Sequence, residues 1–155
     1  KRIKPTAASI ECFDISNLQG TWAVGSKVSF INGDPAKSRY RRYRIKFVKG
    51  ISDVGMLSEI IQRRFKSKKD YPLPDLVLVD GGKGQVLSAQ KVINELGLNI
   101  PVIGLAKRRE VIVTSAGAIK LSRDDFALKL LQRLRDESHR FAIKYHRLLA
   151  ARQIG

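Results

Sequence analysis

A short, almost wholly apolar run at residues 75–79 (Asp-Leu-Val-Leu-Val) stands out in a strongly charged chain and leads directly into Asp80. Apolar runs of this length are typical of strands buried on both faces, as in parallel sheets covered by helices. A glycine-rich turn follows at 81–85, and a helical pattern continues over 85–96 until Gly97, where glycine commonly ends a helix. The run therefore predicts an α/β fold, with Asp80 at the carboxyl end of an inner strand.

The first third of the chain has the two-residue alternation of antiparallel strands. Residues 9–16 are rich in β-forming side chains, and apolar residues alternate with small or polar ones over 22–30. The pair Asn32-Gly33 is typical of a tight hairpin turn, and residues 38–48 supply the partner strand. Three consecutive strands with short connections predict an antiparallel meander.

The rest of the chain alternates between helical and strand patterns. A helix is expected from an N-cap at Ser52 to Phe65, a buried strand over 101–106, a hairpin over 111–121 and a long terminal helix from an N-cap at Ser122.

The element order β-β-β-α-β-α-β followed by a helix limits the possible topologies. If the fourth strand lies beside the first, right-handed crossovers give a mixed five-stranded sheet of order 3-2-1-4-5, with strand 2 antiparallel and helices on both faces. This α/β arrangement is ribonuclease H-like. We expect one domain over residues 1–155 and, because no Met begins the chain, a fragment of a longer protein.

Net charge indicates the partner. Thirty Lys and Arg against fourteen Asp and Glu give +16 and a pI of about 10.4, which favours binding of a polyanion such as nucleic acid. Residues 37–49 carry seven of these cations, no acid and interleaved aromatic side chains, a pattern suited to phosphate contact. A second basic run at 63–69 serves either DNA or a solvated face.

Two further absences restrict the possibilities. Cys12 is the single cysteine, so an internal disulfide and a cysteine zinc site are excluded and a reduced, cytoplasmic setting is expected. No apolar run is long enough to cross a bilayer, so no membrane partner is expected.

Two aspartates each interrupt a strand pattern. Asp14 lies within the first strand and Asp80 ends the fourth, and in the predicted order these strands are parallel neighbours about 4.8 Å apart. The two carboxylates could then bind one hard cation, which favours Mg²⁺ or Mn²⁺ over zinc. The ends of parallel strands are also where α/β sheets place their ligand sites.

A histidine on the terminal helix is the candidate third member of the site. His139 lies in a charged stretch, and an imidazole can ligate a metal or take a proton from an attacking water. His146 is seven residues further on, about 10.5 Å along a helix axis, and is too far away to share the ion. Such a site hydrolyses phosphodiesters. Lys83 and Lys107 are expected near the same strand ends, as accessory groups that hold the phosphate or assist proton transfer.

Six segments closely resemble the C-terminal endonuclease domain of the UvrC family, over residues 10–147. These segments are Phe13-Asp-Ile-Ser16, Gln19-Gly20, Tyr40-Arg-Arg-Tyr43, Val79-Asp-Gly-Gly-Lys-Gly-Gln85, Gly104-Leu-Ala-Lys107 and Leu131-Gln-Arg-Leu-Arg-Asp-Glu-Ser-His-Arg-Phe-Ala142. The resemblance implies a ribonuclease H-like nuclease that cuts DNA on the 5′ side of a lesion in nucleotide excision repair. It also implies that Asp14, Asp80 and His139 form its metal site.

The resemblance carries further expectations. It implies damaged double-stranded DNA as substrate and UvrB as a partner, reached through parts of the protein absent here. A further acid of the family falls near Asp53 by spacing, and Asn17 stands where the family usually has His. The residues expected to contact DNA are Arg41, Arg42, Tyr43, Arg44, Gln85, Arg135 and Arg140.

Two other functions remain open at this point. The chain could be a nucleic-acid-binding module of the same fold whose carboxylates serve only structure. It could also be a nuclease for RNA–DNA hybrids or junctions. Residue patterns leave open whether one or two metal ions bind.

Overall fold

The structure, a computed structural model, describes residues 8–17, 22–46, 53–67, 72–106 and 111–154. Its elements in chain order are β1 (Ser9–Asn17), β2 (Trp22–Ile31), β3 (Asp34–Pro35), the short 3₁₀ helix η1 (Lys37–Arg39), β4 (Arg41–Lys46), α1 (Asp53–Lys66), β5 (Leu76–Asp80), α2 (Lys83–Glu95), β6 (Val102–Leu105), β7 (Val111–Thr114), β8 (Gly117–Lys120) and α3 (Phe126–Ile154).

All strands belong to one mixed sheet of order β3-β2-β1-β5-β6-β7-β8, in which β4 also pairs with β2. Strands β1, β5 and β6 are parallel, and β2 is antiparallel to both β1 and β4. The predicted order 3-2-1-4-5 corresponds to β4-β2-β1-β5-β6 and is confirmed. The ribonuclease H-like fold class is confirmed with it.

Two parts of the sheet differ from the prediction. The expected hairpin is present as β7 and β8, but β7 pairs antiparallel with β6, so the hairpin adds two strands to the predicted five. The third predicted strand is also divided, because β3 ends at Pro35 and η1 precedes β4. Proline has no N–H to donate to a strand ladder, which accounts for the interruption.

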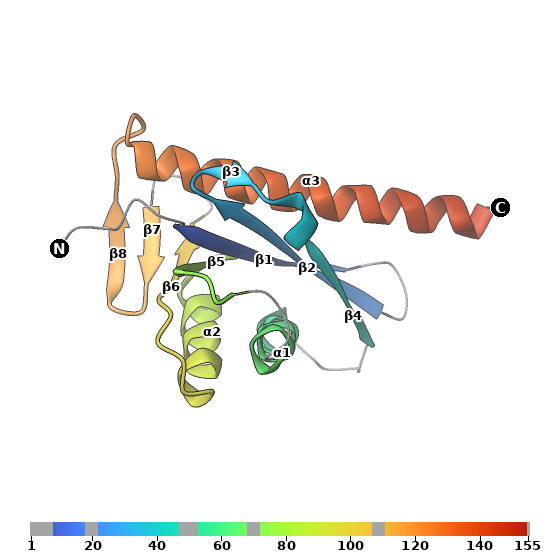
Figure 1. The fold of residues 1–155 in the computed structure, drawn as a ribbon, viewed down its shortest axis with the longest axis horizontal. Helices are drawn as coiled ribbons and strands as arrows, with labels where there is room; N and C mark the ends of the chain where they lie inside the picture. Colours follow the sequence, from blue (N-terminus) through green and yellow to red (C-terminus); the bar gives the residue numbers. More distant parts are fainter. Residues whose placement is uncertain (1–7, 18–21, 47–52, 68–71, 107–110, 155) are drawn as a thin grey trace.

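Helices cover the two faces of the sheet unequally (Figure 1). Helices α1 and α2 lie on one face and α3 lies on the other, and the last turns of α3 extend beyond the sheet. The α1 face buries Met56, Leu57, Ile60 and Ile61 at helical spacing, together with residues of α2 and β5. The α3 face buries Leu128, Leu131 and Leu134 against the opposite side of the same strands.

Helix α3 begins later than its sequence pattern predicts. Its first N–H groups are capped by Asp125, whose Oδ1 accepts from Ala127 N at 2.8 Å and Leu128 N at 3.3 Å. The prediction that Ser122 caps this helix is wrong. Ser122 lies one turn earlier, and its carbonyl oxygen accepts a hydrogen bond from Asp125 N at 2.9 Å. Ser52, predicted to cap α1, lies outside the described residues.

A buried ion pair joins α1 to the sheet. Arg64 Nε and one terminal nitrogen donate to the two carboxylate oxygens of Glu11 on β1, at 2.9 and 2.8 Å, and the Pro72 carbonyl accepts a further bond. Both side chains are almost fully buried. Arg64, although part of the second basic run at 63–69, is therefore buried and has a structural role.

No helix in the described part of the chain is both long enough and apolar enough to cross a bilayer.

Candidate metal centre

The parallel pairing of β1 with β5 brings two aspartates to the same level of the sheet. The register pairs Phe13 with Val79, and Asp14 and Asp80 are the next residue of each strand. Asp14 continues along β1 opposite Ser26 of β2, whereas Asp80 is the last residue of β5. Both carboxylates therefore occupy the carboxyl-end region of the parallel strands, as predicted.

Helix α3 supplies the third side chain. His139 Nε2 lies 2.9 Å from Asp80 Oδ2 and 3.7 Å from Asp14 Oδ2. One ligand atom from each of the three residues lies within 4.8 Å of the other two, and no other such group of three or more occurs among the described residues. The side chains are 13%, 29% and 41% exposed for Asp14, Asp80 and His139, so solvent and a phosphate can reach the group.

The carboxyl group of Asp14 is energetically unfavourable in its charged form. Burial and the nearby charge of Asp80 raise its pKa from 3.8 to about 6, although His139, Arg135 and a hydrogen bond from Ile15 N–H act in the opposite direction. Repulsion between two carboxylates is the condition that a bound cation relieves. The electrostatics of the site therefore favour occupation by a positive ion.

The hydrogen bond between His139 and Asp80 determines the position of one proton. An ionised Asp80 carboxylate can only accept, so this hydrogen bond then requires the His139 tautomer that carries its proton on Nε2. If Nε2 is to become a metal ligand, this proton must leave. Binding of a cation and retention of the proton therefore exclude each other at this nitrogen.

The turn after β5 is held in place by close contacts. A Cβ atom on Gly104 of β6 would come within 2.5 Å of the Gly81 carbonyl oxygen and 2.8 Å of Val86 Cγ2. Only glycine permits this approach of β6 to the residue that follows Asp80. On the other side of the turn, Gln85 Oε1 accepts from Gly82 N–H at 3.2 Å, which fixes the start of α2.

The chemistry of the donor set fits a hard divalent cation. Two carboxylates and one imidazole supply oxygen and nitrogen ligands, and no thiol is among them. The residues present therefore fit the Mg²⁺ or Mn²⁺ ion that the sequence predicts.

The predicted accessory residues have different outcomes. Lys83 is exposed at the start of α2, just beyond the turn that follows Asp80. Lys107 lies outside the described residues. Asp53 is exposed at the start of α1 and is not among the three clustered residues. Asn17 is the last residue of β1.

Residues 41–44 of β4 alternate between the two faces of the sheet. The Arg42 guanidinium carbon lies 4.1 Å and 4.7 Å from the ring centroids of Phe141 and Tyr145, so this residue packs on α3. Burial lowers its pKa. Tyr43 is buried on the α1 face, so its ring contributes to the core.

The two flanking arginines of this segment differ in exposure. Arg41 donates to the carbonyl oxygens of Ser38 and Tyr40, and Arg44 is exposed.

Arg135 and Arg140, both predicted to contact DNA, differ in how deeply they are buried. Arg135 is 7% exposed and lies beneath the site, where its charge acts on Asp14 and Cys12. Arg140 is half exposed and forms a two-point ion pair with Glu137. Sequence patterns identified both as basic but could not distinguish the buried residue from the exposed one.

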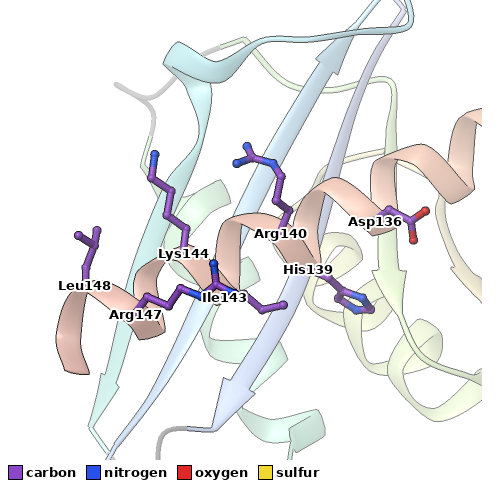
Figure 2. Close-up of a pocket in the computed structure, with 7 residues that line it drawn as sticks. All are labelled: Asp136, His139, Arg140, Ile143, Lys144, Arg147 and Leu148. Carbon is purple, nitrogen blue, oxygen red and sulfur yellow. The ribbon is translucent and has the colours of Figure 1, made fainter. Parts of the chain in front are cut away.

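A shallow groove on α3 runs from Asp136 past His139 toward the carboxyl end of the helix (Figure 2). Its lining consists of Asp136, His139, Arg140, Ile143, Lys144, Arg147 and Leu148. The sequence analysis identified His139 and Arg140 as functional candidates and missed the other five. The available signal was the recurrence of basic residues at helical spacing after His139.

Comparison with known proteins gives a family match over most of the chain. The family model described as the UvrC RNase H endonuclease domain matches residues 2–143. UvrABC system protein C of Methanococcoides burtonii is 54% identical over 147 residues, which cover 90% of this chain and 24% of that protein. The same-named protein of Chlorobaculum tepidum is 52% identical over 144 residues, covering 90% and 23%. The chain thus spans about a quarter of the length of these relatives.

Solved structures share the fold at much lower identity. A crystal structure of human ENDOV has a TM-score of 0.50 and 16% identity, over 83% of this chain and 54% of that one. A Ciona intestinalis Endonuclease V D234N complex with a 23mer inosine-containing DNA also has a TM-score of 0.50, at 19% identity, over 65% and 46%.

Proposed function

The chain belongs to the UvrC RNase H endonuclease domain family, and we propose that it is a metal-dependent nuclease that hydrolyses a DNA phosphodiester bond. The observation that carries this proposal is the convergence of Asp14, Asp80 and His139 within 4.8 Å at the carboxyl-end region of two parallel strands. Positive charge elsewhere on the chain supplies the attraction to a polyanion.

Asp14 and Asp80 would hold the ion, which is Mg²⁺ or Mn²⁺. When bound, such an ion neutralises the charge that develops on the phosphate oxygens during attack by water. Asp14 remains ionised when the cation is present, because the repulsion from Asp80 that raises its pKa is then offset.

His139 can serve in either of two ways. Its Nε2 can complete the ligand set after losing the proton that it now donates to Asp80. Alternatively, the imidazole keeps that hydrogen bond, orients the carboxylate and exchanges protons with the attacking water. Lys83, exposed next to the turn that follows Asp80, is positioned to contact the phosphate.

Nicking of supercoiled plasmid in Mg²⁺ or Mn²⁺ tests the proposal. We expect the wild-type chain to nick. Asp14→Asn and Asp80→Asn should each lower the nicking rate at least about a hundredfold. Mutation of a group that only hydrogen-bonds to a metal ligand usually costs about 10- to 100-fold, and loss of the ligand itself should cost more. Asp34→Asn is the matched control, since Asp34 is an exposed carboxylate on β3 outside the cluster. Equal nicking by wild type and both site variants would mean that the carboxylates serve only structure.

The substrate is the second part of the proposal. We expect damaged double-stranded DNA to be cut on the 5′ side of the lesion, in cooperation with UvrB. The domain can be exchanged for the matching segment of the Methanococcoides burtonii relative and assayed with UvrB on a duplex with one lesion. The Asp14→Asn chimera should lose the 5′ product that the unmodified chimera gives. Faster cutting of an RNA–DNA hybrid or a four-way junction would contradict this substrate assignment.

A further inference from the structure

The groove on α3 is continuous with the proposed metal centre, because His139 belongs to both. Beyond His139 the groove contains three cations, Arg140, Lys144 and Arg147, and a single acid, Asp136, at its other end. Within the part of the chain that the structure describes, neither Lys144 nor Arg147 forms an ion pair, so both charges are available to a ligand.

The side chains form two flanks of the groove. In Figure 2, Arg140 and Lys144 point to one side of α3, and His139, Ile143 and Arg147 lie on the other. Between Arg140 and Arg147 the helix rises by about 10.5 Å, with Lys144 between them, so the three cations are spread along the groove and can each meet a different phosphate. The spacing of the cations therefore matches a short stretch of phosphodiester backbone.

An apolar side chain lies between the charged ones. Ile143 is 50% exposed and lines the same groove. A deoxyribose presents an apolar face between consecutive phosphates, so an exposed aliphatic residue flanked by cations suits a nucleotide strand better than a simple anion.

One of the cations is held in a fixed orientation. Glu137 accepts from Arg140 Nε at 2.6 Å and from a terminal nitrogen at 2.8 Å, and Tyr40 on the loop before β4 donates to the same carboxylate at 2.7 Å. Such a two-point contact fixes the guanidinium plane. Arg140 is therefore preorganised at the entrance of the groove, next to His139.

We propose that this groove binds the phosphodiester backbone of the cleaved strand over about three nucleotides on one side of the scissile phosphate. The inference rests on the proposed nuclease function, because the metal centre defines where the scissile phosphate lies. Arg140, Lys144 and Arg147 contact consecutive phosphates, and Ile143 supports the sugar between them. These residues position the substrate and take no part in the bond-breaking step.

The first test measures binding without cleavage. Fluorescence anisotropy with a duplex in EDTA, over a range of salt concentrations, compares the wild type with Lys144→Gln/Arg147→Gln. Each lost phosphate contact reduces the salt slope by about one unit, so we expect a decrease of about two and a 10- to 100-fold weaker affinity near 0.1 M salt. Lys91→Gln/Lys129→Gln removes the same charge from exposed sites outside the groove and should have a much smaller effect.

A second pair of variants tests the apolar part of the groove. Ile143→Asp should weaken binding at least tenfold. Ile119→Asp should not, although Ile119 on β8 is equally exposed at 50%. Circular dichroism checks that each variant is folded. If the groove variants and their controls weaken binding equally, the groove is not the backbone site.

Plasmid nicking separates this inference from the proposed function. A positioning role predicts that Lys144→Gln/Arg147→Gln raises KM and leaves kcat unchanged. If the wild type nicks and the groove variants retain the wild-type KM and salt slope, the groove proposal fails while the nuclease proposal stands. If nothing nicks but the salt slope changes as expected, the nuclease proposal fails and the groove still binds a nucleic acid backbone.

Discussion

His139 Nε2 lies 2.9 Å from Asp80 Oδ2, and this contact joins α3 to the last residue of β5. Asp14 Oδ2 lies 3.7 Å from the same nitrogen, so a proton on this nitrogen faces two carboxylates. A cation that enters this space competes with that proton. Occupancy of the site should therefore depend strongly on pH.

Replacing Asp14 with Asn should stabilise the metal-free protein while it abolishes nicking. The carboxylate is buried next to Asp80, and its raised pKa shows that the charged form is unfavourable at neutral pH. An amide of similar shape removes the charge, so we expect a gain on the order of 1–2 kcal/mol in the free energy of unfolding, or a few degrees in Tm. Differential scanning calorimetry in EDTA measures it.

Asp34→Asn again serves as the control for this measurement, because its exposed carboxylate should change Tm very little. Addition of Mg²⁺ should stabilise the wild type and leave Asp14→Asn unchanged, since the variant lacks a ligand. A variant less stable than the wild type in EDTA would show that Asp14 is not under electrostatic strain.

The contribution of Asp14 to the stability of the metal-free protein should decrease as the pH rises from about 4 to about 6.5. The folded-state pKa of Asp14 is about 6, above its ordinary value of 3.8, so the folded protein binds more protons than the unfolded chain across this interval. Unfolding then releases a proton, and the folded state loses its advantage as the pH rises through the folded-state pKa. The Tm difference between the wild type and Asp14→Asn, measured at several pH values, isolates this contribution.

Saturating Mg²⁺ should reverse the trend. The ion binds the ionised carboxylate, so the stabilisation that it confers should increase from pH 5 to pH 7.5, with release of protons on binding. Calorimetric titration in two buffers of different ionisation enthalpy counts those protons. Binding with no proton release at pH 6 would contradict the competition between the metal and the proton.

Breaking the Glu11–Arg64 pair should destabilise the fold much more than removing it entirely. In Glu11→Gln the guanidinium loses its charged partner in a site that is almost fully buried, at a cost of about 3–5 kcal/mol. The double variant Glu11→Leu/Arg64→Met buries no charge and should recover most of that loss. Urea unfolding gives both values, and a double variant no more stable than Glu11→Gln would contradict this account.

The central sheet and the two candidate metal-site aspartates could be read from the sequence because each of these features depends on local pattern. The apolar run before Asp80 predicts an inner parallel strand, and the alternation around Asp14 predicts the strand that pairs with it. Once the two strands are neighbours, the carboxylates must lie close together. His139 required the resemblance to a family, because helical periodicity alone does not show which face of α3 meets β5.

Other features depend on tertiary contacts that local pattern does not encode. The hairpin β7–β8 was predicted, but its pairing with the sheet was not; free edges of sheets tend to pair, and here β6 offers such an edge. The burial of Arg64 and Arg135 was missed because the sequence around a basic residue does not show whether an acidic side chain lies opposite it in the fold. Asp125 caps α3 instead of Ser122, since both residue types can do so and the preceding turn decides.

Replacing Gly104 with Ala should weaken metal binding through a residue that touches no ligand of the ion. The new Cβ would lie 2.5 Å from the Gly81 carbonyl oxygen, so the backbone after Asp80 must move. We expect at least a tenfold loss in Mn²⁺ affinity, together with a destabilisation of about 1–3 kcal/mol from the overpacked contact. Isothermal titration calorimetry and urea unfolding measure the two effects.

Gly84→Ala is the matched control in the same segment, since its Cβ would meet nothing within 4 Å. Gly84 lies in α2, where alanine is favoured over glycine by about 0.5–1 kcal/mol, so this variant should be more stable and should bind Mn²⁺ normally. If Gly104→Ala loses stability but retains wild-type affinity, the Gly104–Gly81 contact serves packing alone. If the loss in Mn²⁺ binding free energy instead exceeds the loss in the free energy of unfolding, the Gly104–Gly81 contact positions the Asp80 carboxylate opposite Asp14.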